Sequence, residues 1–421
     1  MVNEVKLRAS RLEGEVYISG AKNSGLKLLT ASILTSEQVI LNKVPCQIAD
    51  FQVHIGMLKE LGKEVAEDGS SVKIKEVQAL DKLIWDGRSI RNTLLILGCQ
   101  LTRFHRGAVP LPGGCKLGER KYDLHVAAME QFGARVWEEG DYLCAEADGR
   151  LKGCEIHLPI RSTGATENCI LMGCLAVGQT RIWNPHIRPE IIDLIKMLRA
   201  MGAKITVFGQ ESIVIEGVEA LGGVEYNCIP DNMEALTFAI GTAMTGGEVE
   251  IHNFPFDHLE VPLIHLRESG LNYYRSVDGN SVIIRKSQTY PVEISTGPYP
   301  GINSDMQPLF GAFAMVAKGE SRIVDLRFPG RYQYSEEFQK LGGDTAIEGD
   351  LLKINGGAPL VGATVRALDL RAGAALTLCG LVAAGETTIT NFVQVMRGYE
   401  FFIDKLRSLN ADVEAVAFKP E

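Results

Sequence analysis

Residues 191–208 read IIDLIKMLRAMGAKITVF, and this stretch holds the pattern that decides the fold. Its first eight residues carry apolar side chains at helical spacing. Gly202 follows where such a helix should stop, because glycine takes the left-handed conformation at a helix C-terminus with little strain. Residues 204–208 then alternate and include β-branched side chains, as strands do. The stretch therefore predicts an amphipathic helix, a glycine that ends it, and a strand.

The same phrase recurs along the chain at intervals of about 70 residues, which indicates an internal repeat. A second recurring element is an apolar helix rich in small residues, expected at residues 165–177, 235–244 and 372–384 and buried because it is apolar on nearly all sides. An ordinary α/β enzyme with accidental Leu-Gly endings would not give six matches at such even spacing. We therefore predict six similar units, with a boundary near residues 228–231 that divides them into two domains of three. The residues at which a helix should stop are Gly62, Gly133, Gly202, Gly270, Gly342 and Asn410.

The composition excludes several classes of protein. The 421 residues are 46% hydrophobic and 23% charged, with a net charge of −9. These values suit a globular chain and argue against disorder and against a basic surface for nucleic acid or membrane. The nine cysteines are odd in number and form no CxxC pair, so neither a disulfide framework nor a zinc ribbon is expected. Because no signal-peptide core or membrane-length apolar stretch occurs, we expect a soluble cytoplasmic protein.

Residues 110–120, PLPGGCKLGER, form the most unusual segment of the chain. Two prolines and three glycines predict a loop that can move. Cys115 lies in its middle with Lys116 and Arg120 near it, and cations close to a thiol lower its pKa and favour the reactive thiolate. The alternative is an inert structural cysteine, which is the usual state of a buried thiol. That alternative fits the three cysteines in predicted apolar helices, Cys169, Cys174 and Cys379.

Residues 20–25, GAKNSG, predict a turn between a strand and an apolar helix. Backbone amides at a helix start bind anions, and Lys22 adds positive charge there. The glycine spacing of a nucleotide-hydrolysing loop is not found in this turn. A capped helix start with a solvated lysine is the plainer interpretation, and by itself the turn favours it.

Charged residues at other turns add candidates for an anion site. Arginine binds carboxylate and phosphate with a forked pair of donors, although each arginine alone is most simply a surface residue. Asp305 and Asp369 each open an apolar helix and are most simply N-caps, and Asp305 can also serve as a base. The arginines at turns or near helix starts are Arg91, Arg120, Arg331, Arg371 and Arg397.

Together these residues resemble the enolpyruvyl transferases, and within them the branch that acts on UDP-N-acetylglucosamine. The resemblance runs from about residue 12 to residue 416, and its most specific parts are the Pro-Gly-Gly-Cys loop and the Lys-Asn turn. The shikimate-pathway branch lacks this loop and has a Gly-Asn-Ala-Gly-Thr phrase that the sequence does not contain. The matching phrases are GAKN at 20–23, LPGGC at 111–115, Gly118 with Arg120, DLH at 123–125, GAT at 164–166, PD at 230–231, DMQ at 305–307, DLRA at 369–372 and RGYE at 397–400.

The resemblance implies a fold and a division into domains. Enolpyruvyl transferases are α/β proteins with two domains, each an inside-out barrel of three similar units with helices inside and sheets outside. Their chain begins in one domain, crosses to the other and returns, which implies crossings near Ala21 and near Ile229 here. We therefore expect a first domain at residues 22–229, with the mobile Cys115 loop, and a second at residues 1–21 plus 230–421.

The resemblance also implies a reaction. The enolpyruvyl group of phosphoenolpyruvate moves to the 3-hydroxyl of UDP-N-acetylglucosamine through a tetrahedral intermediate, phosphate is released, and peptidoglycan synthesis is thereby begun. Asp305 would take the proton of the hydroxyl, and Cys115 would donate one to the methylene carbon and form an adduct with fosfomycin. Positive charge that faces the intermediate would stabilise it. Neither a metal nor an organic cofactor is implied.

The site residues implied by the resemblance fall into three groups. The catalytic residues would be Cys115, Asp305, Lys22 and Arg397. The residues that bind phosphoenolpyruvate would be Lys22, Arg91, Arg120, Arg331, Arg371 and Arg397. The residues that bind the UDP-sugar would be Asn23, Arg120, Lys121, Tyr122, Asp123, Leu124, Ser162, Thr163, Gly164, Asp305 and Arg327.

The sequence departs from the family pattern around the nucleotide pocket and the cationic residues, although the catalytic set is intact. Two alternatives therefore stay open. One is an enolpyruvyl transferase with a different nucleotide or sugar as acceptor, and the other is a catalytically silent paralogue that binds the nucleotide. A retained cysteine in a mobile loop argues against the silent paralogue. The departures are Lys121 and Tyr122 in place of Arg-Pro, Arg188 and Met396 in place of acidic residues, Asn232 in place of an arginine, and Phe328-Pro329-Gly330-Arg331 in place of Phe-Glu-Asn-Arg.

Overall fold

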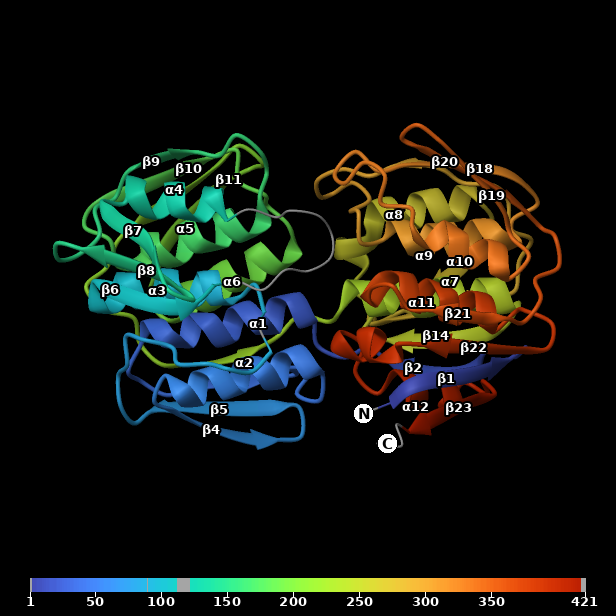
Figure 1. The fold of residues 1–421 in the computed structure, drawn as a ribbon, viewed down its shortest axis with the longest axis horizontal. Helices are drawn as coiled ribbons and strands as arrows, with labels where there is room; N and C mark the ends of the chain where they lie inside the picture. The colour runs from blue at the N-terminus through green and yellow to red at the C-terminus, as the bar shows by residue number, and fades with distance from the viewer. Residues whose placement is uncertain (1, 89, 112–121, 418–421) are drawn as a thin grey trace. The chain divides into compact units, whose positions relative to one another are not determined.

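A computed structural model describes residues 2–88, 90–111 and 122–417 of the chain. The chain folds into two compact units, here called unit 1 (Met1–Ser19 with Pro230–Glu421) and unit 2 (Gly20–Ile229). Each unit has its own hydrophobic core. In each unit Figure 1 shows helices packed together with the sheets outside them.

Unit 2 is built from helices and short strands that alternate along the chain (Figure 1). Its helices are α1 (Lys22–Ala31), η1 (Ser32–Leu34), α2 (Ala49–Glu60), α3 (Thr93–Phe104), α4 (Asp123–Gln131), α5 (Thr163–Leu175) and α6 (Pro189–Ala200). Its strands are β3 (Val39–Asn42), β4 (Lys63–Asp68), β5 (Ser71–Glu76), β6 (Arg106–Pro110), β7 (Ala134–Glu139), β8 (Tyr142–Ala147), β9 (Glu155–His157), β10 (Gln179–Trp183), β11 (Lys204–Phe208), β12 (Ser212–Glu216) and β13 (Val224–Asn227).

Unit 1 takes its first two strands from the N-terminal segment and the rest from the second half of the chain. Its helices are α7 (Asn232–Thr245), α8 (Phe256–Glu268), α9 (Gln307–Val316), α10 (Tyr334–Lys340), α11 (Leu370–Gly380), η2 (Phe392–Arg397) and α12 (Phe402–Ser408). Its strands are β1 (Val2–Arg8), β2 (Glu13–Tyr17), β14 (Glu248–His252), β15 (Asn272–Arg275), β16 (Ser281–Arg285), β17 (Glu293–Ser295), β18 (Gly319–Val324), β19 (Asp344–Glu348), β20 (Leu351–Gly356), β21 (Thr364–Arg366), β22 (Glu386–Thr390) and β23 (Val413–Ala417).

The helix stops expected from the sequence are present in the structure. Each of the six residues adopts a positive φ, from 65° at Asn410 to 104° at Gly202. Each one follows the end of a helix, and the chain then enters a strand, as from α6 to β11. The left-handed conformation at these positions is the reason for the recurring Gly or Asn, because other side chains are strained there.

The sheets repeat one pattern of pairing. In the sheet β13-β3-β5-β4 the first two strands are parallel and the later pairs are antiparallel. The same order recurs in β9-β10-β12-β11, β2-β14-β16-β15, β17-β18-β20-β19 and β21-β22-β1-β23. The sheet β6-β8-β7 is antiparallel, and a parallel bridge from Lys82 to Ala108 lies where the other sheets have a parallel strand.

The apolar helices predicted from small residues are buried, but two of them end earlier than expected. Helix α5 ends at Leu175 rather than at residue 177, where an isolated bridge pairs Val177 with Lys152. Helices α5, α7 and α11 contribute nearly all of their residues to the interior. The helix expected to run to residue 384 ends at Gly380, with a turn before an isolated bridge at Ala384. The backbone of Ala384 donates to Leu360 O in that bridge, so pairing with a distant segment ends the helix early.

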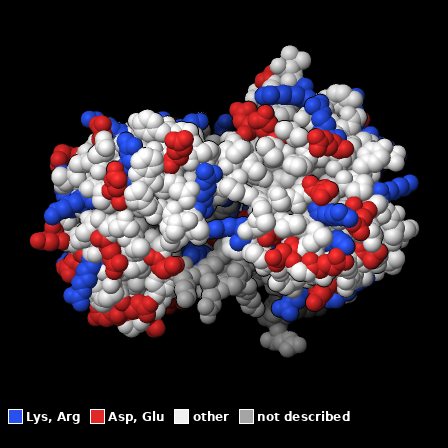
Figure 2. All heavy atoms as spheres, turned by 90° about the horizontal axis from the view of Figure 1, so that it is seen from above, with Lys and Arg blue, Asp and Glu red and all other residues white. Residues whose placement is uncertain are grey.

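The described surface carries charges of both signs. Figure 2 shows Lys and Arg side chains interspersed with Asp and Glu side chains over the face that it draws. No helix within residues 2–88, 90–111 and 122–417 is long and apolar enough to cross a membrane.

Candidate active site

Lys22 is the first residue of α1, and its side chain is buried rather than solvated. The N-cap residue, Ala21, has an extended backbone and provides no side-chain cap. Lys22 is 8% exposed, and its Nζ lies 2.6 Å from Oδ2 of Asp50. Arg88 approaches the other oxygen of that carboxylate, with Nη2 3.2 Å from Oδ1. The interpretation of this turn as a capped helix with a solvated lysine is therefore wrong, because an ion pair holds the side chain inside unit 2.

The start of α1 is fastened to α6 by a buried carboxylate. Ser24 donates a hydrogen bond from its hydroxyl to Asp193 Oδ2. Tyr226 donates to Oδ1 of the same carboxylate at 2.7 Å. Asp193 lies on α6, so these bonds fix the first turn of α1 beside Lys22 and Asn23. Asn23 is half-buried as the second residue of that turn.

A second lysine of α1 enters a polar network that sequence reasoning missed. Lys27 donates from Nζ to Oδ1 of Asn92 at 2.7 Å and lies 3.6 Å from Oε2 of Glu167. Asn92 in turn donates to Nδ1 of His54 at 3.1 Å. Glu167 is the one charged residue of α5, a helix whose residues are nearly all buried. A charged residue within such a helix is the sequence signal that would have found this network.

Burial shifts the pKa values of Glu167 and His54 in this network, and that of His125, which also senses the charge of Lys27. Burial raises the pKa of Glu167 to about 7, against the opposing effect of the Lys27 ammonium. Burial and Lys27 lower the pKa of His54 to about 3. Burial, with Arg91 and Lys27, likewise lowers the pKa of His125 to about 3. Both imidazoles are therefore neutral at pH 7 and act as polar packing rather than as cations.

Residues 162–164, expected at the UDP-sugar, form the start of α5. Ser162 is the N-cap, and its hydroxyl accepts a hydrogen bond from Ala165 N at 3.4 Å. The Thr163 hydroxyl lies 2.8 Å from Nδ1 of His186. Gly164 is required by close packing, because a Cβ there would lie 2.9 Å from Nε2 of His125.

Arg188, one of the departures from the family pattern, lies just before α6. It forms a fork on Glu190, with Nε 2.7 Å from Oε2 and Nη2 2.8 Å from Oε1. Glu190 is 3% exposed, so the pair is largely removed from water. The arginine thus neutralises the acidic side chain that lies two residues after it.

The remaining predicted residues of unit 2 lie at helix starts. Arg91 is half-buried and precedes α3. Tyr122 precedes α4, and its hydroxyl donates to Glu138. Asp123 is exposed in the first turn of α4, and Leu124 packs partly against the core of unit 2.

Some predicted residues fall outside the part of the chain that the structure describes. They are Cys115, Arg120 and Lys121, together with Lys116 and the glycines of the same loop. The three cysteines predicted to be structural are fully buried within their helices. Burial raises the pKa of each of these thiols, which keeps them protonated and unreactive.

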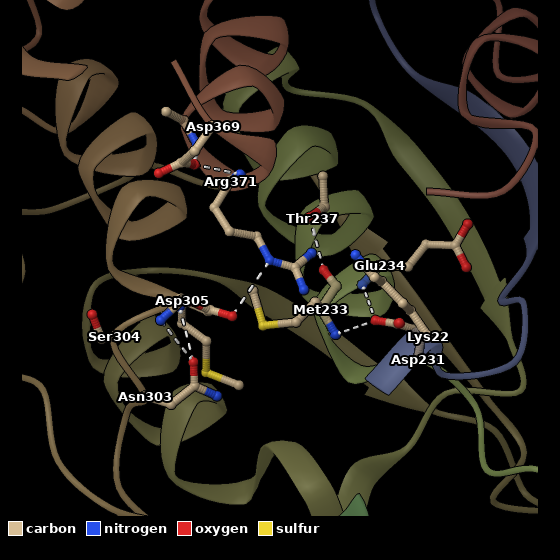
Figure 3. Close-up of polar contacts among 12 residues, drawn as sticks. Lys22, Asp231, Met233, Glu234, Thr237, Asn303, Ser304, Asp305, Asp369 and Arg371 are labelled. Carbon is tan, nitrogen blue, oxygen red and sulfur yellow. Dashed lines mark hydrogen bonds and ion pairs between the residues drawn. The ribbon is translucent and has the colours of Figure 1, made fainter. Parts of the chain in front are cut away.

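In unit 1 the structure brings Asp305 together with two buried arginines. Arg331 Nη1 lies 3.0 Å from Asp305 Oδ1, and Arg371 Nε lies 3.9 Å from Asp305 Oδ2. Figure 3 shows the guanidinium of Arg371 pointing toward Asp305. Both arginine side chains are at most 6% exposed, whereas that of Asp305 is 41% exposed. The carboxylate can therefore meet a substrate while the cations hold it from inside.

Asp369 links the two arginines. Its Oδ1 caps α11 by accepting from Arg371 N and Ala372 N, each at 2.8 Å (Figure 3). Its Oδ2 lies 3.5 Å from Nη2 of Arg331. The N-cap predicted at Asp369 is thus confirmed, and the same carboxylate also contacts the arginine that pairs with Asp305.

The N-cap predicted at Asp305 was wrong. Helix α9 begins at Gln307, and its N-cap residue Met306 has no side-chain cap. The turn before it is closed by Asn303, whose Oδ1 accepts from Asp305 N at 2.9 Å and from Met306 N at 3.2 Å (Figure 3). Asn303 therefore accepts the hydrogen bonds that an N-cap would accept, and the Asp305 carboxylate pairs with Arg331 instead.

A second group of polar residues surrounds Arg371 and the start of α7. Burial acts to lower the pKa of Arg371, yet Tyr399, Asp305 and Asp231 raise it on balance. The Tyr399 hydroxyl lies 2.8 Å from the hydroxyl of Thr237 on α7. Asp231 is the N-cap of α7 and accepts from Met233 N at 2.8 Å and from Glu234 N at 2.9 Å (Figure 3).

Glu234 forms a buried ion pair at the start of α7. It is 1% exposed, and its Oε1 lies 2.6 Å from Lys405 Nζ. Its Oε2 accepts from the backbone of Ser19 at 2.7 Å, and Lys405 also donates to the Ser19 hydroxyl at 2.6 Å. Burial raises the pKa of Glu234 to about 7, although Lys405 opposes this. Sequence reasoning missed this group, because its members are far apart in the chain.

Two further arginines of unit 1 were expected at the site. Arg397 ends η2 and is half-buried, and its Nη1 donates to Oε1 of Gln394 at 3.0 Å. Arg327 is exposed, with its guanidinium 5.5 Å from the centre of the Phe328 ring. The guanidinium of Arg331 lies 5.9 Å from the centre of the same ring.

One group of possible metal ligands occurs among the described residues. Glu15, Glu250 and His252 have ligand atoms within 4.8 Å of one another. They lie on the neighbouring parallel strands β2 and β14, whereas the site residues described above lie mainly at helix starts.

Comparison with known proteins identifies the family. The family model described as EPSP synthase (3-phosphoshikimate 1-carboxyvinyltransferase) matches residues 7–406. The UDP-N-acetylglucosamine 1-carboxyvinyltransferase of Serratia proteamaculans is 39% identical over 411 residues, which are 97% of each chain. The UDP-N-acetylglucosamine 1-carboxyvinyltransferase 2 of Carboxydothermus hydrogenoformans is 39% identical over 410 residues, again 97% of each chain.

Solved structures agree with this match. The enolpyruvyl transferase NikO of Streptomyces tendae superposes with a TM-score of 0.89 at 25% identity, over 98% of this chain and 99% of that chain. An EPSP synthase of Acinetobacter baumannii gives a TM-score of 0.76 over 98% of this chain and 100% of that chain, and its 17% identity shows the fold alone. The chain therefore belongs to the EPSP synthase family of enolpyruvyl transferases and is an enzyme.

Proposed function

We propose that the chain transfers the enolpyruvyl group of phosphoenolpyruvate to the 3-hydroxyl of UDP-N-acetylglucosamine and releases phosphate. The observation that carries the proposal is the cluster in unit 1, where Arg331 and Arg371 hold a half-exposed Asp305. Addition of a hydroxyl to an anionic substrate needs a base with positive charge beside it. The names of the relatives at 39% identity support UDP-N-acetylglucosamine as the acceptor and a carboxyvinyl group as the group transferred.

In the first step the 3-hydroxyl oxygen bonds to C2 of phosphoenolpyruvate. Asp305 takes the hydroxyl proton, and Cys115 donates a proton to the methylene carbon, so that a tetrahedral intermediate forms. In the second step the methyl carbon formed in the first step returns a proton to the Cys115 thiolate. The bond from C2 to the phosphate oxygen breaks, phosphate leaves, and the carbon–carbon double bond returns. Burial of Arg331 and Arg371 supports a stabilising role, because fixed charges act strongly where water is excluded.

Phosphoenolpyruvate is proposed to bind to a set of cationic side chains. Lys22 is supported by its place at the start of α1, where backbone N–H groups also favour an anion. Arg397 is supported by its half-buried position at the end of η2, because a guanidinium can bind carboxylate and phosphate with a forked pair of donors. The other proposed members of the set are Arg91, Arg120, Arg331 and Arg371.

The UDP-sugar is proposed to bind mainly to loops and helix starts of unit 2. The start of α5 supports this, because Thr163 is oriented by His186 and Gly164 brings the backbone close to His125. The proposed residues are Asn23, Arg120, Lys121, Tyr122, Asp123, Leu124, Ser162, Thr163, Gly164, Asp305 and Arg327.

We also propose that the chain is built from six similar units, three in each domain, as an inside-out barrel whose first domain carries the Cys115 loop. The recurring sheet order and the recurring positive-φ helix ends support this. The proposed biological setting is peptidoglycan synthesis, hence cell-wall formation and cell shape, in the cytoplasm.

The function is tested by measuring phosphate release from phosphoenolpyruvate with each of a panel of UDP-sugars and nucleotides. We expect release with UDP-N-acetylglucosamine, and loss of most of that activity in Asp305→Asn. The proposal is wrong if the wild type releases no phosphate with UDP-N-acetylglucosamine, and Asp305 is not the base if Asp305→Asn is fully active.

A second candidate is the same transfer to a different nucleotide or sugar. The fork of Arg188 on Glu190 favours it, because a family-typical acid is replaced by a cation close to the segment that holds His186. The same panel decides between the two candidates. Turnover with another acceptor at a much higher kcat/KM than with UDP-N-acetylglucosamine would select the second.

A further inference from the structure

The Asp50 carboxylate is shared by two cations in unit 2. Its Oδ2 lies 2.6 Å from Lys22 Nζ, and its Oδ1 lies 3.2 Å from Arg88 Nη2. Asp50 is 4% exposed and sits in the first turn of α2, where a negative charge is favoured by the helix dipole. The carboxylate is therefore held in place by its own helix as well as by both cations.

A lysine that must hold its ammonium group at one place for a ligand needs such a partner. Its side chain has four rotatable carbons and a point charge, so it adopts many conformations unless something fixes it. The hydrogen bond from Nζ to Asp50 selects one conformation of Lys22 before any anion arrives. A group held in its binding geometry loses less entropy when the ligand binds, which strengthens binding.

Two cations and one carboxylate also leave a net positive charge. If Asp50 paired with Lys22 alone, it would cancel much of the attraction of the ammonium for an anion. Arg88, whose side chain is 38% exposed, shares the carboxylate and restores that attraction. The arrangement thus fixes Lys22 without neutralising the place where it lies.

We propose that Asp50 is a positioning residue that holds Lys22 for phosphoenolpyruvate, and that Arg88 keeps Asp50 from neutralising it. This inference rests on the proposed function, in which Lys22 binds phosphoenolpyruvate. It goes further by assigning roles to two residues that do not themselves touch the substrate.

The chain offers a matched control in the same unit. Glu76 is also shared by a lysine and an arginine, with Oε2 2.9 Å from Lys63 Nζ and Oε1 2.7 Å from Arg103 Nη2. The side chains of Glu76 and Lys63 are 12% and 3% exposed, which is close to the burial of Asp50 and Lys22. Glu76→Gln therefore reports what the loss of a buried shared carboxylate does to unit 2 without touching Lys22.

The experiment compares the wild type with Asp50→Asn, Arg88→Gln and Glu76→Gln. The dissociation constant of phosphoenolpyruvate is measured by calorimetry, and kcat and both KM values are measured from phosphate release. In Asp50→Asn we expect phosphoenolpyruvate to bind about tenfold more weakly, the size of a lost charge-assisted hydrogen bond, with a lower kcat and an unchanged acceptor KM. Glu76→Gln is expected to lower the melting temperature and leave all these constants unchanged.

Other results overturn the inference. If Asp50 merely opposed the local positive charge, Asp50→Asn would bind phosphoenolpyruvate more tightly. Equal losses in Asp50→Asn and Glu76→Gln would make Asp50 a structural residue. If Asp50→Asn does not fold, Arg88→Gln decides, because a half-exposed side chain can be replaced without unfolding the protein. Weaker phosphoenolpyruvate binding by Arg88→Gln supports the inference, and unchanged binding contradicts it.

Failure of the proposed function would look different. A wild type that binds phosphoenolpyruvate but transfers nothing refutes the proposed reaction, while the binding constants of the variants still test the role of Asp50. A wild type that does not bind phosphoenolpyruvate refutes both.

Discussion

Glu234→Gln should change how the stability of the protein depends on pH. In the folded chain Glu234 is buried against Lys405, and its pKa is raised from 4.5 to about 7. The folded state therefore favours the protonated form. This stabilising contribution is complete below the unfolded pKa and is lost as the pH rises through about 7. Glutamine keeps the shape and the acceptor for Ser19 N but does not ionise.

The magnitude follows from the two pKa values. One pKa unit corresponds to about 1.4 kcal/mol, so a rise from 4.5 to about 7 lowers the free energy of unfolding by about 3 kcal/mol at high pH. About 1 kcal/mol of this is already lost at pH 5. The stability of Glu234→Gln relative to the wild type should therefore increase by about 2 to 3 kcal/mol between pH 5 and pH 8.5. Glu167, His54 and His125 titrate in both proteins and cancel in the difference.

Urea denaturation at fixed ionic strength, followed by circular dichroism at several pH values, measures this difference. Glu219→Gln is a suitable control, because it removes an ion pair with Arg150 from a side chain that is 90% exposed. That change should alter stability by less than about 1 kcal/mol at every pH. The reasoning is refuted if the difference between Glu234→Gln and the wild type is constant from pH 5 to pH 8.5, or if the wild type gains on the variant as the pH rises.

Four further predictions concern the site. Fosfomycin should label Cys115 far faster than the other cysteines, as mass spectrometry of the labelled protein can show, and even labelling would count against its role. Asp305→Asn should lower turnover by about 10²-fold with little change in acceptor binding. The melting temperature should change little, because Asn303 and not Asp305 closes the turn before α9. Normal turnover would show that Asp305 is not the base. Arg397→Ala should raise the KM of phosphoenolpyruvate about tenfold in steady-state kinetics; a change confined to the acceptor KM would place it at the nucleotide. Asp369→Ala should lower the free energy of unfolding by at least about 1 kcal/mol in urea denaturation, since it removes the cap of α11; an unchanged midpoint would contradict this.

Features that depend on local conformation could be predicted from the sequence. A helix that ends at Gly202 or Asn410 needs a residue in the left-handed conformation there, and glycine and asparagine adopt this conformation with little strain. The strand after each stop is likewise visible in local alternation. The cap at Asp369 was predictable for the same reason, because its acceptors and donors are neighbours in the chain.

Features that depend on distant partners could not be predicted in this way. From the sequence, Lys22 is most simply a solvated lysine. Its ion-pair partner, Asp50, lies on a different helix, with Oδ2 2.6 Å from Lys22 Nζ. From the sequence, Asp305 is most simply an N-cap, whereas in the structure it pairs with Arg331. The ion pair of Glu234 with Lys405 joins residues that are 171 positions apart in the chain, and no local pattern marks it.

The proposed transfer to UDP-N-acetylglucosamine is tested most directly by identifying the product. The enzyme is incubated with phosphoenolpyruvate and UDP-N-acetylglucosamine, and the nucleotide fraction is analysed by mass spectrometry and NMR. We predict a UDP-sugar with one carboxyvinyl ether on its 3-oxygen and one phosphate released for each product molecule. Recovery of unmodified UDP-N-acetylglucosamine alone, with no phosphate released, would contradict it.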